Sequence, residues 1–367
     1  MLFKLIKVIR VLRIIGILLL ANTLSAQDTF ERTYGGEQDD MGYSVQQTPD
    51  GGYIIAGRTG YGLGGTEVYL IKTDILGDTV WTKTFGTQNY DDIGTCVQYT
   101  TDQGYIIAGY NLDQLIPSGA DVQLLKTNPV GEQKWLKTFD NSVREYGHSV
   151  RQTSDGGYII AGSINLRIMG GIPQDEYDMY LIKTDSSGTE QWTKTYQNGD
   201  QSFGYCVQQT SDGGYVIAGQ TGSYNEGIYD AYLLKTDSAG DIMWTETYGG
   251  SGFDGAYCVL QTQDDGYLMA GYTDSYDSSG EYDISLVKTN SSGKMLWTRI
   301  YGGPYDDYCT SVDMTSDEGY IIAGYTESFG AGGLDAYLIR TSSSGDTLWT
   351  KTYGGAGDDR ANSVQQT

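Results

Sequence analysis

The chain has 367 residues, with 23 lysine and arginine residues against 47 aspartate and glutamate residues, for a net charge of −24. This acidic balance excludes a nucleic-acid-binding protein, because phosphate backbones require a basic surface. The aromatic content of 12% and the recurring Tyr-Ile-Ile runs exclude a disordered acidic chain.

The first 26 residues differ in chemistry from everything that follows. An apolar run at 14–20 precedes the small residues Ser25 and Ala26, and the basic residues before it are Lys4, Lys7, Arg10 and Arg13. This order predicts a signal peptide over residues 1–26, cleaved after Ala26 or after Ser25. The alternative is an uncleaved anchor helix, which the short apolar run disfavours. We therefore expect a protein that is secreted or displayed on the cell surface, with no membrane span after cleavage.

From residue 27 onward the chain repeats one motif six times. Its best example is Asp212-Gly213-Gly214-Tyr215-Val216-Ile217-Ala218-Gly219, and the equivalent tyrosines lie 52 to 57 residues apart, at positions 53, 105, 158, 215, 267 and 320. Self-similarity at a nearly fixed period predicts a repeat architecture before any local structure is assigned.

Each repeat contains four short segments that are typical of β-strands. In the fourth unit they are residues 205–210, 214–219, 230–236 and 242–248, rich in β-branched and aromatic residues and bounded by Gly, Asp, Asn and Ser. No stretch after residue 26 shows sustained helical periodicity. The sequence therefore predicts an all-β fold.

The connections between these segments favour tight turns. An aspartate equivalent to Asp212 recurs in all six repeats, and a glycine equivalent to Gly240 recurs between the third and fourth segments. Aspartate can accept a hydrogen bond from its own backbone two residues on, and glycine tolerates positive φ. We interpret the six aspartates as turn residues rather than as a catalytic or calcium-binding series.

Four antiparallel strands in about fifty residues match one blade of a β-propeller. The six tryptophans share one position in the fourth strand and are expected to pack between blades. Residues 27–367 then form one propeller domain with six complete blades and part of a seventh. Of that seventh blade the chain supplies a fourth strand at 30–34 and a first strand at 363–367. A chain truncated at its C-terminus explains this count; a closed six-bladed ring with two loose ends is the alternative.

The repeat resembles secreted bacterial propeller-repeat proteins of the Bacteroidetes type, which carry DGGYIIAG, YLIKTD and WTKTYGG motifs. The resemblance covers residues 28–367, as in Asp335-Ala336-Tyr337-Leu338-Ile339-Arg340 followed by residues 349–355. It implies the fold and export and leaves the activity open. The pattern differs from kelch repeats in the position of the double glycine, and from WD40 repeats in lacking their Gly-His and Trp-Asp pairs.

A binding surface is expected on the face where loops vary between repeats. Acidic pairs and aromatic residues gather in these loops, and the candidate ligand-binding residues are Asp39, Asp40, Asp91, Asp92, Asp306, Asp307, Tyr229, Tyr276 and Tyr282. Aromatic faces stack on sugars and carboxylates bind Ca²⁺, so a glycan, with or without calcium, is the ligand class that fits. The alternative is that the acids only solubilise the protein and stabilise turns.

Enzyme chemistry has little support in the sequence. His148 is the single histidine, so a histidine-ligated metal site or a serine–histidine triad is not expected, and we assign no catalytic or metal-binding residue. The expected function is a monomeric, non-catalytic binding or scaffold module for a glycan or surface protein. The alternative is a glycan-active or quinoprotein-like secreted enzyme that uses the variable face.

Two further features carry expectations. Cys96, Cys206 and Cys258 share one strand position that is serine in other repeats, with Cys309 two residues earlier in its own unit. We expect equivalent residues of neighbouring blades to lie too far apart for a disulfide. The loop at 163–177 is longer and more apolar than its counterparts, and we expect it to pack on the rim of a neighbouring blade.

Overall fold

The computed structural model describes residues 3–8, 12–15 and 30–367, apart from 38, 61–64, 88, 114–118, 142, 167, 170–171, 174–175, 200, 224–227 and 277–279. Every regular element in these ranges is a β-strand, which confirms the all-β prediction. The same ranges contain no apolar helix of membrane-spanning length.

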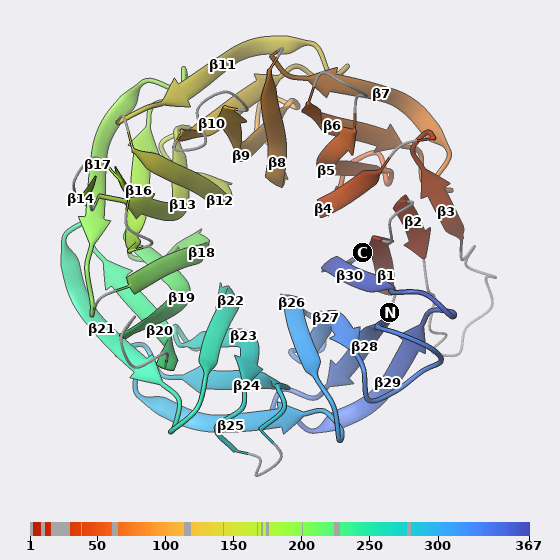
Figure 1. Ribbon diagram of the computed structural model, residues 1–367, viewed down its shortest axis with the longest axis vertical. Coiled ribbons are helices and arrows are strands. Elements are labelled where there is room, and N and C mark those ends of the chain that lie inside the picture. The colour runs from red at the N-terminus through yellow and green to blue at the C-terminus, as the bar shows by residue number, and fades with distance from the viewer. Residues whose placement is uncertain are drawn as a thin grey trace.

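Six antiparallel sheets of four strands follow one another along the chain (Figure 1). The first contains β4 (Asp40–Gln47), β5 (Tyr53–Gly60), β6 (Thr66–Thr73) and β7 (Thr79–Phe85). The second contains β8 (Tyr90–Tyr99), β9 (Tyr105–Asp113), β10 (Ala120–Thr127) and β11 (Gln133–Phe139). The third contains β12 (Arg144–Gln152), β13 (Tyr158–Asn165), β16 (Asp178–Thr184) and β17 (Glu190–Tyr196).

The next three sheets repeat this order. The fourth contains β18 (Gln201–Gln209), β19 (Tyr215–Ser223), β20 (Ile228–Thr236) and β21 (Ile242–Tyr248). The fifth contains β22 (Asp254–Gln261), β23 (Tyr267–Thr273), β24 (Asp283–Thr289) and β25 (Met295–Tyr301). The sixth contains β26 (Asp307–Met314), β27 (Tyr320–Thr326), β28 (Asp335–Thr341) and β29 (Thr347–Tyr353).

The sheets are arranged around a common centre, with the first strand of each nearest the axis and the fourth at the rim (Figure 1). One parallel bridge between Ala120 and Arg144 joins the second and third sheets. Within the long loop of the third sheet, β14 (Ile168–Met169) pairs with β15 (Ile172–Pro173). Of the aliphatic residues in that loop, Ile164 is buried and Leu166 is exposed. The side chains of 167–175 lie outside the described residues, so packing of the whole loop stays a prediction.

The two ends of the chain meet between the sixth sheet and the first (Figure 1). There β30 (Arg360–Gln366) pairs with β1 (Phe3–Val8), and β2 (Leu12–Ile15) pairs with β3 (Glu31–Tyr34). Backbone of the segment predicted as a signal peptide therefore lies beside both terminal strands of the predicted propeller domain. The signal peptide itself stays a prediction, and cleavage after Ala26 would remove β1 and β2.

The predicted turn chemistry is present. In the fourth sheet, the Asp212 carboxylate accepts hydrogen bonds from the backbone nitrogen of Gly214 at 3.0 Å and from the hydroxyl of Thr210 at 2.6 Å. Gly240 has φ of 80° and closes the outer hairpin in the left-handed region, where a side chain would be strained. These turns fix the register of each sheet.

The core lies between neighbouring sheets. Trp244 of one sheet contacts Tyr267 of the next at 5.7 Å between ring centroids, and Trp81 contacts Tyr105 at 5.9 Å. Equivalent pairs recur around the ring, and each contributes roughly 0.5–1.5 kcal/mol beyond the burial of apolar area. The tryptophans are packing residues, as predicted.

Candidate functional site

A β-bulge interrupts the first strand of each complete sheet. The register shifts where one residue of the inner strand is skipped, and the skipped residues are Tyr43, Thr95, His148, Tyr205, Tyr257 and Thr310. A bulge leaves its extra residue out of the ladder and redirects the side chain. His148 contacts Tyr205 at 5.4 Å and Tyr205 contacts Tyr257 at 5.0 Å, so skipped residues of consecutive inner strands meet around the axis.

These rings belong to a larger continuous surface that we call the aromatic belt. Its members lie between the start and the bulge of the first strands, at the end of the second strands and in the adjoining loops, with successive ring centroids 4.9 to 6.4 Å apart. They are Tyr110, Tyr146, His148, Tyr177, Phe203, Tyr205, Tyr229, Phe253, Tyr257, Tyr272, Tyr282, Tyr308 and Tyr325. Most are half-buried. The belt therefore presents aromatic faces and phenol groups along the loop face that varies between repeats.

The belt is uncharged at neutral pH. Burial raises the pKa of Tyr257 and of Tyr146 to about 12, so both phenols keep their protons. Burial lowers the pKa of His148 to about 4, so this imidazole is neutral as well. Protonated phenols donate as well as accept hydrogen bonds. Such a surface suits a neutral ligand with apolar faces and many hydroxyl groups.

The structure brings two of the predicted tyrosines together. Tyr229 contacts Phe253 at 6.3 Å, and Phe253 contacts Tyr282 at 6.4 Å, so Tyr229 and Tyr282 are both members of the belt. Tyr276 lies outside it and is 54% exposed.

The predicted acidic pairs divide into two kinds of residue. The second member of each pair, Asp40, Asp92 or Asp307, is buried. Each accepts a hydrogen bond at 2.8 Å from a backbone nitrogen of its preceding loop, from Gly36, Thr87 and Gly303 respectively. Burial raises the pKa of Asp92 and Asp307. These three carboxyl groups hold the loop that enters the inner strand and present little surface to a ligand.

The first members are more accessible. Asp39 is exposed. Asp91 accepts a hydrogen bond from the backbone nitrogen of Thr66 at 2.8 Å, and Asp306 accepts a hydrogen bond from the backbone nitrogen of Tyr282 at 2.9 Å. A hydrogen bond with Asp306 raises the pKa of Glu281, and this half-exposed pair of carboxyl groups lies beside the belt.

The residue that directly follows each bulge, and the equivalent residue of β30, take part in a ring of contacts around the axis. We call these seven positions the axial ring. Each side chain at this position contacts the backbone of the following inner strand. The serine hydroxyls accept from backbone nitrogens at 3.2 to 3.3 Å, in the pairs Ser44–Val97, Ser149–Val207, Ser311–Val364 and Ser363–Val45. The thiols donate to carbonyl oxygens at 3.7 to 3.8 Å, in the pairs Cys96–Val150, Cys206–Val259 and Cys258–Val312.

Along the axis these inner strands line a cavity of about 180 Å³ that contains one arginine, Arg151. Its Nη1 donates to the carbonyl oxygen of Val150 at 2.8 Å and to Cys96 Sγ at 3.4 Å. The sequence interpretation missed this residue as a functional candidate. Its position in the repeat could have revealed it, because an arginine there replaces the glutamine that other units have at 46, 98, 208 and 365.

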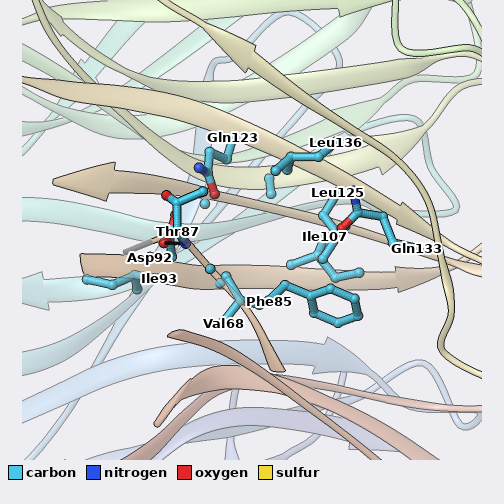
Figure 2. Close-up of a pocket in the computed structure, with 14 residues that line it drawn as sticks. Val68, Phe85, Thr87, Asp92, Ile93, Ile107, Gln123, Leu125, Gln133 and Leu136 are labelled. Atoms are coloured by element: carbon cyan, nitrogen blue, oxygen red, sulfur yellow. Dashed lines mark hydrogen bonds between the residues drawn. The ribbon is translucent and has the colours of Figure 1, made fainter. Parts of the chain in front are cut away.

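A different cavity, of about 210 Å³, lies between the first and second sheets (Figure 2). Figure 2 shows Gln123, Thr87 and Asp92 gathered at one end, with Leu125 and Leu136 among the apolar lining. Gln123 stands where four sister units have Tyr69, Tyr180, Tyr232 and Tyr337. We interpret this cavity as the space left by a missing tyrosine ring rather than as a ligand site.

Within the described ranges, no three or more His, Cys, Asp or Glu side chains are grouped so as to hold a metal ion. The carboxyl groups of the variable face are distributed around the ring, and several are engaged by backbone nitrogens, as described above.

No family model matches the chain. The regulatory protein FlaEY of Caulobacter vibrioides is 23% identical over 225 residues, which is 52% of this chain; the chain spans 23% of that relative's length. Among solved structures, an α-L-arabinanase of Penicillium chrysogenum complexed with arabinobiose has a TM-score of 0.54 at 10% identity, with 81% of this chain and 92% of the other covered. A protein of unknown function from Dyadobacter fermentans has a TM-score of 0.52 at 12% identity, with coverage of 83% and 94%. At these identities the structures show the fold alone, a propeller-like arrangement of four-stranded sheets.

Proposed function

We propose that this protein is a secreted or surface-displayed, non-catalytic binding module that holds a neutral glycan on the aromatic belt. The observation that carries the proposal is the continuity of the belt, whose half-buried rings connect five neighbouring sheets at the variable face. Sugar rings combine apolar C–H faces with hydroxyl groups. They therefore match a surface of aromatic faces and protonated phenols.

We infer further that seven units close the ring. The seventh contains β30 and β3, whose partner strands β1 and β2 would be absent from a chain cleaved after Ala26. The contacts of Ser311 with Val364 and of Ser363 with Val45 support it, because they continue the axial ring through β30 to the first sheet. A closed ring holds the belt on a rigid frame, so a ligand meets preorganised aromatic groups.

The first ligands to test are neutral oligosaccharides, including arabinan fragments, since one structure of similar fold was solved with arabinobiose. Binding should be insensitive to calcium, because the acidic pairs hold loops rather than converge on one point. Measurements with calcium and with EDTA address this directly.

The test is a glycan array on the purified protein, followed by calorimetry on the best ligand. Tyr205→Thr and Tyr257→Thr remove belt rings, while threonine is the natural residue at the equivalent bulges Thr95 and Thr310, so both variants should fold. We expect each to weaken binding by at least about tenfold, as for truncation of an aromatic anchor.

Tyr276→Ala is the matched control, because this tyrosine is exposed and lies outside the belt. It should bind as the unchanged protein does. Equal affinity of the belt variants and the control would contradict the proposal, as would failure of every neutral glycan to bind.

A glycan-active enzyme is the second candidate, favoured by the carboxyl group of Glu281 beside the belt, whose pKa a hydrogen bond with Asp306 raises. A carboxyl group with a raised pKa is the usual general acid of glycoside cleavage. Release of reducing sugar from a bound glycan, abolished in Glu281→Gln, would replace the non-catalytic proposal with this one.

A further inference from the structure

Cysteine occupies the axial ring in three of its seven positions, and only two of these are consecutive. Cys96 and Cys206 are separated by Ser149, whereas Cys206 and Cys258 stand on the neighbouring inner strands β18 and β22. Both thiols are free, and their sulfur atoms lie 4.0 Å apart. Equivalent cysteines of neighbouring blades are expected to lie too far apart for a disulfide, and the two thiols are unbonded, but their sulfur atoms are close enough to contact each other.

One member of the cysteine pair lines the axial cavity. Cys258 is half-buried and lines the cavity, while Cys206 is buried behind it. Arg151 lines the same cavity and contacts Cys96, and Asp313 is a carboxyl-bearing residue in the lining. A small molecule that enters the cavity therefore meets Cys258 before Cys206, and Cys96 is the other cysteine in the lining.

We propose that Cys206 and Cys258 form a reactive dithiol, which a low-molecular-weight disulfide entering the axial cavity oxidises to a disulfide between the fourth and fifth sheets. This inference does not depend on the proposed glycan function, because it concerns the axis below the belt and needs no carbohydrate.

The reaction balances as two thiol–disulfide exchanges. The Cys258 thiolate attacks one sulfur of the small disulfide, forms a mixed disulfide and releases one small thiol. The Cys206 thiolate then attacks Cys258 Sγ, forms the Cys206–Cys258 bond and releases the second small thiol. The protein gives up two thiol protons and two electrons, and the small disulfide takes them up as two thiols.

The required movement is local. The sulfur atoms must close from 4.0 Å to about 2.05 Å, the length of a disulfide bond. Cys258 Sγ now points to the carbonyl oxygen of Val312 at 3.7 Å. Rotation of the Cys258 side chain toward Cys206 loses only this weak thiol contact.

The surroundings favour the thiolate that completes the reaction. In the reduced pair, the hydrogen bond between the two thiols, together with the positive charge of Arg151, lowers the pKa of Cys206 to about 6 against the effect of burial, while the same hydrogen bond raises the pKa of Cys258. Once Cys258 is in the mixed disulfide this hydrogen bond is lost, and the charge of Arg151 still favours the Cys206 thiolate. Arg151 replaces the glutamine of sister units, so Arg151→Gln removes this charge and restores a residue that the repeat already accommodates.

The experiment uses the full chain, fully reduced and freed of reductant, then incubated with bis(2-hydroxyethyl) disulfide at pH 7.5. Acid quenching, alkylation and peptide mass mapping locate every thiol. We expect one Cys206–Cys258 cross-link, with Cys96 and Cys309 alkylated. Arg151→Gln should slow cross-linking by about threefold or more, because the thiolate fraction falls.

Serine variants separate the two steps, and serine is the natural residue of this ring in four units. Cys206→Ser should stop at a mixed disulfide on Cys258, and Cys258→Ser should stay reduced. The proposal is overturned if the folded protein stays reduced while the urea-unfolded chain reacts, if the mixed disulfide on Cys258 persists in the unchanged protein, or if the cross-link involves Cys96 or Cys309.

Discussion

The ammonium group of Lys235 lies 2.8 Å from the carboxylate of Asp212, although the lysine side chain is 2% exposed and the aspartate side chain is 50% exposed. Lys235 lies on the third strand of its sheet, and its side chain packs against Gly214. Its ammonium group also donates a hydrogen bond to the carbonyl oxygen of Thr236 at 2.8 Å. A Cβ atom on Gly214 would lie 2.7 Å from Lys235 Nζ, so this glycine gives the lysine its path. The same pair recurs in every complete unit, with Arg340 in the sixth.

Removal of the acidic partner should destabilise the protein. Asp212→Ala leaves the Lys235 ammonium buried without a counter-charge. We expect a loss of about 2 kcal/mol in the free energy of unfolding, less than for a fully buried pair because water reaches the carboxylate. Urea denaturation measures it. The control is Asp241→Ala, whose partner Lys194 is 37% exposed; it should cost under about 1 kcal/mol. Equal losses in the two variants would contradict this account.

The same pairs predict acid sensitivity. Burial acts to raise the pKa of Asp212, but hydrogen bonds from Lys235, Thr210 and Gly214 outweigh it and lower the pKa to about 2, and Asp155 and Asp264 behave alike. A carboxyl group whose pKa is lower in the folded state stabilises the protein above its unfolded pKa, and this stabilisation is lost as pH falls through the folded value. Stability should therefore fall between about pH 4 and pH 2. Urea midpoints at pH 5, 4, 3 and 2 test this; a flat profile would refute it.

The repeated parts of the fold follow from local sequence, and its departures from regularity do not. The turn at Asp212 and the glycine at Gly240 were predictable because their chemistry depends only on neighbouring residues. The buried position of Lys235 was not, since lysine in a strand normally indicates a solvent-exposed face, and its partner comes from another turn. Composition and spacing alone cannot reveal such a pair.

The candidate site was only partly predictable for a similar reason. Tyr229 and Tyr282 were identified because loops that vary between repeats suggest binding. Tyr205 and Tyr257 were overlooked because nothing in the alternation of strand residues marks a bulge, which depends on pairing with the second strand. The approach of Cys206 to Cys258 depends on how closely neighbouring inner strands meet at the axis, which is a property of the assembled ring.

Glu145 should make stability fall as pH rises toward neutrality. It occupies the position of the loop-holding aspartates, is fully buried, and accepts a hydrogen bond from Asn141 at 2.6 Å through Oε1. Its Oε2 has no hydrogen-bond partner among the described residues. Burial raises the pKa of Glu145 to about 7.

A carboxyl group whose pKa is higher in the folded state binds its proton more tightly there. Its contribution is therefore favourable at low pH and is lost as pH rises from about 4.5 to about 7. Glu145→Gln should raise the free energy of unfolding by about 2 kcal/mol at pH 8 and change it little at pH 4. Chemical denaturation at both values tests this, with the exposed Glu190→Gln as control. An equal effect at both pH values would exclude ionisation as the cause.

The cavity between the first and second sheets should be fillable with the residues of sister units. Gln123 replaces a tyrosine, and Leu136 replaces the threonine found at Thr245 in the fourth sheet, where it hydrogen-bonds with Tyr232. The second sheet thus has neither the tyrosine nor the threonine of this packed pair, and a cavity of about 210 Å³ lies in their place. Gln123→Tyr combined with Leu136→Thr should restore the pair and raise the free energy of unfolding by about 1–2 kcal/mol.

Single variants show whether packing is the reason. Gln123→Tyr alone places a phenol beside Leu136, where the threonine hydroxyl is missing, so its gain should be smaller than that of the double variant. Leu136→Thr alone removes apolar contacts and should destabilise the protein. The two changes should therefore be coupled by about 0.5 kcal/mol or more in a double-mutant cycle. Simple additivity would show that the two positions do not form a packed pair, and destabilisation by the double variant would contradict the interpretation of the cavity as the space of a missing tyrosine ring.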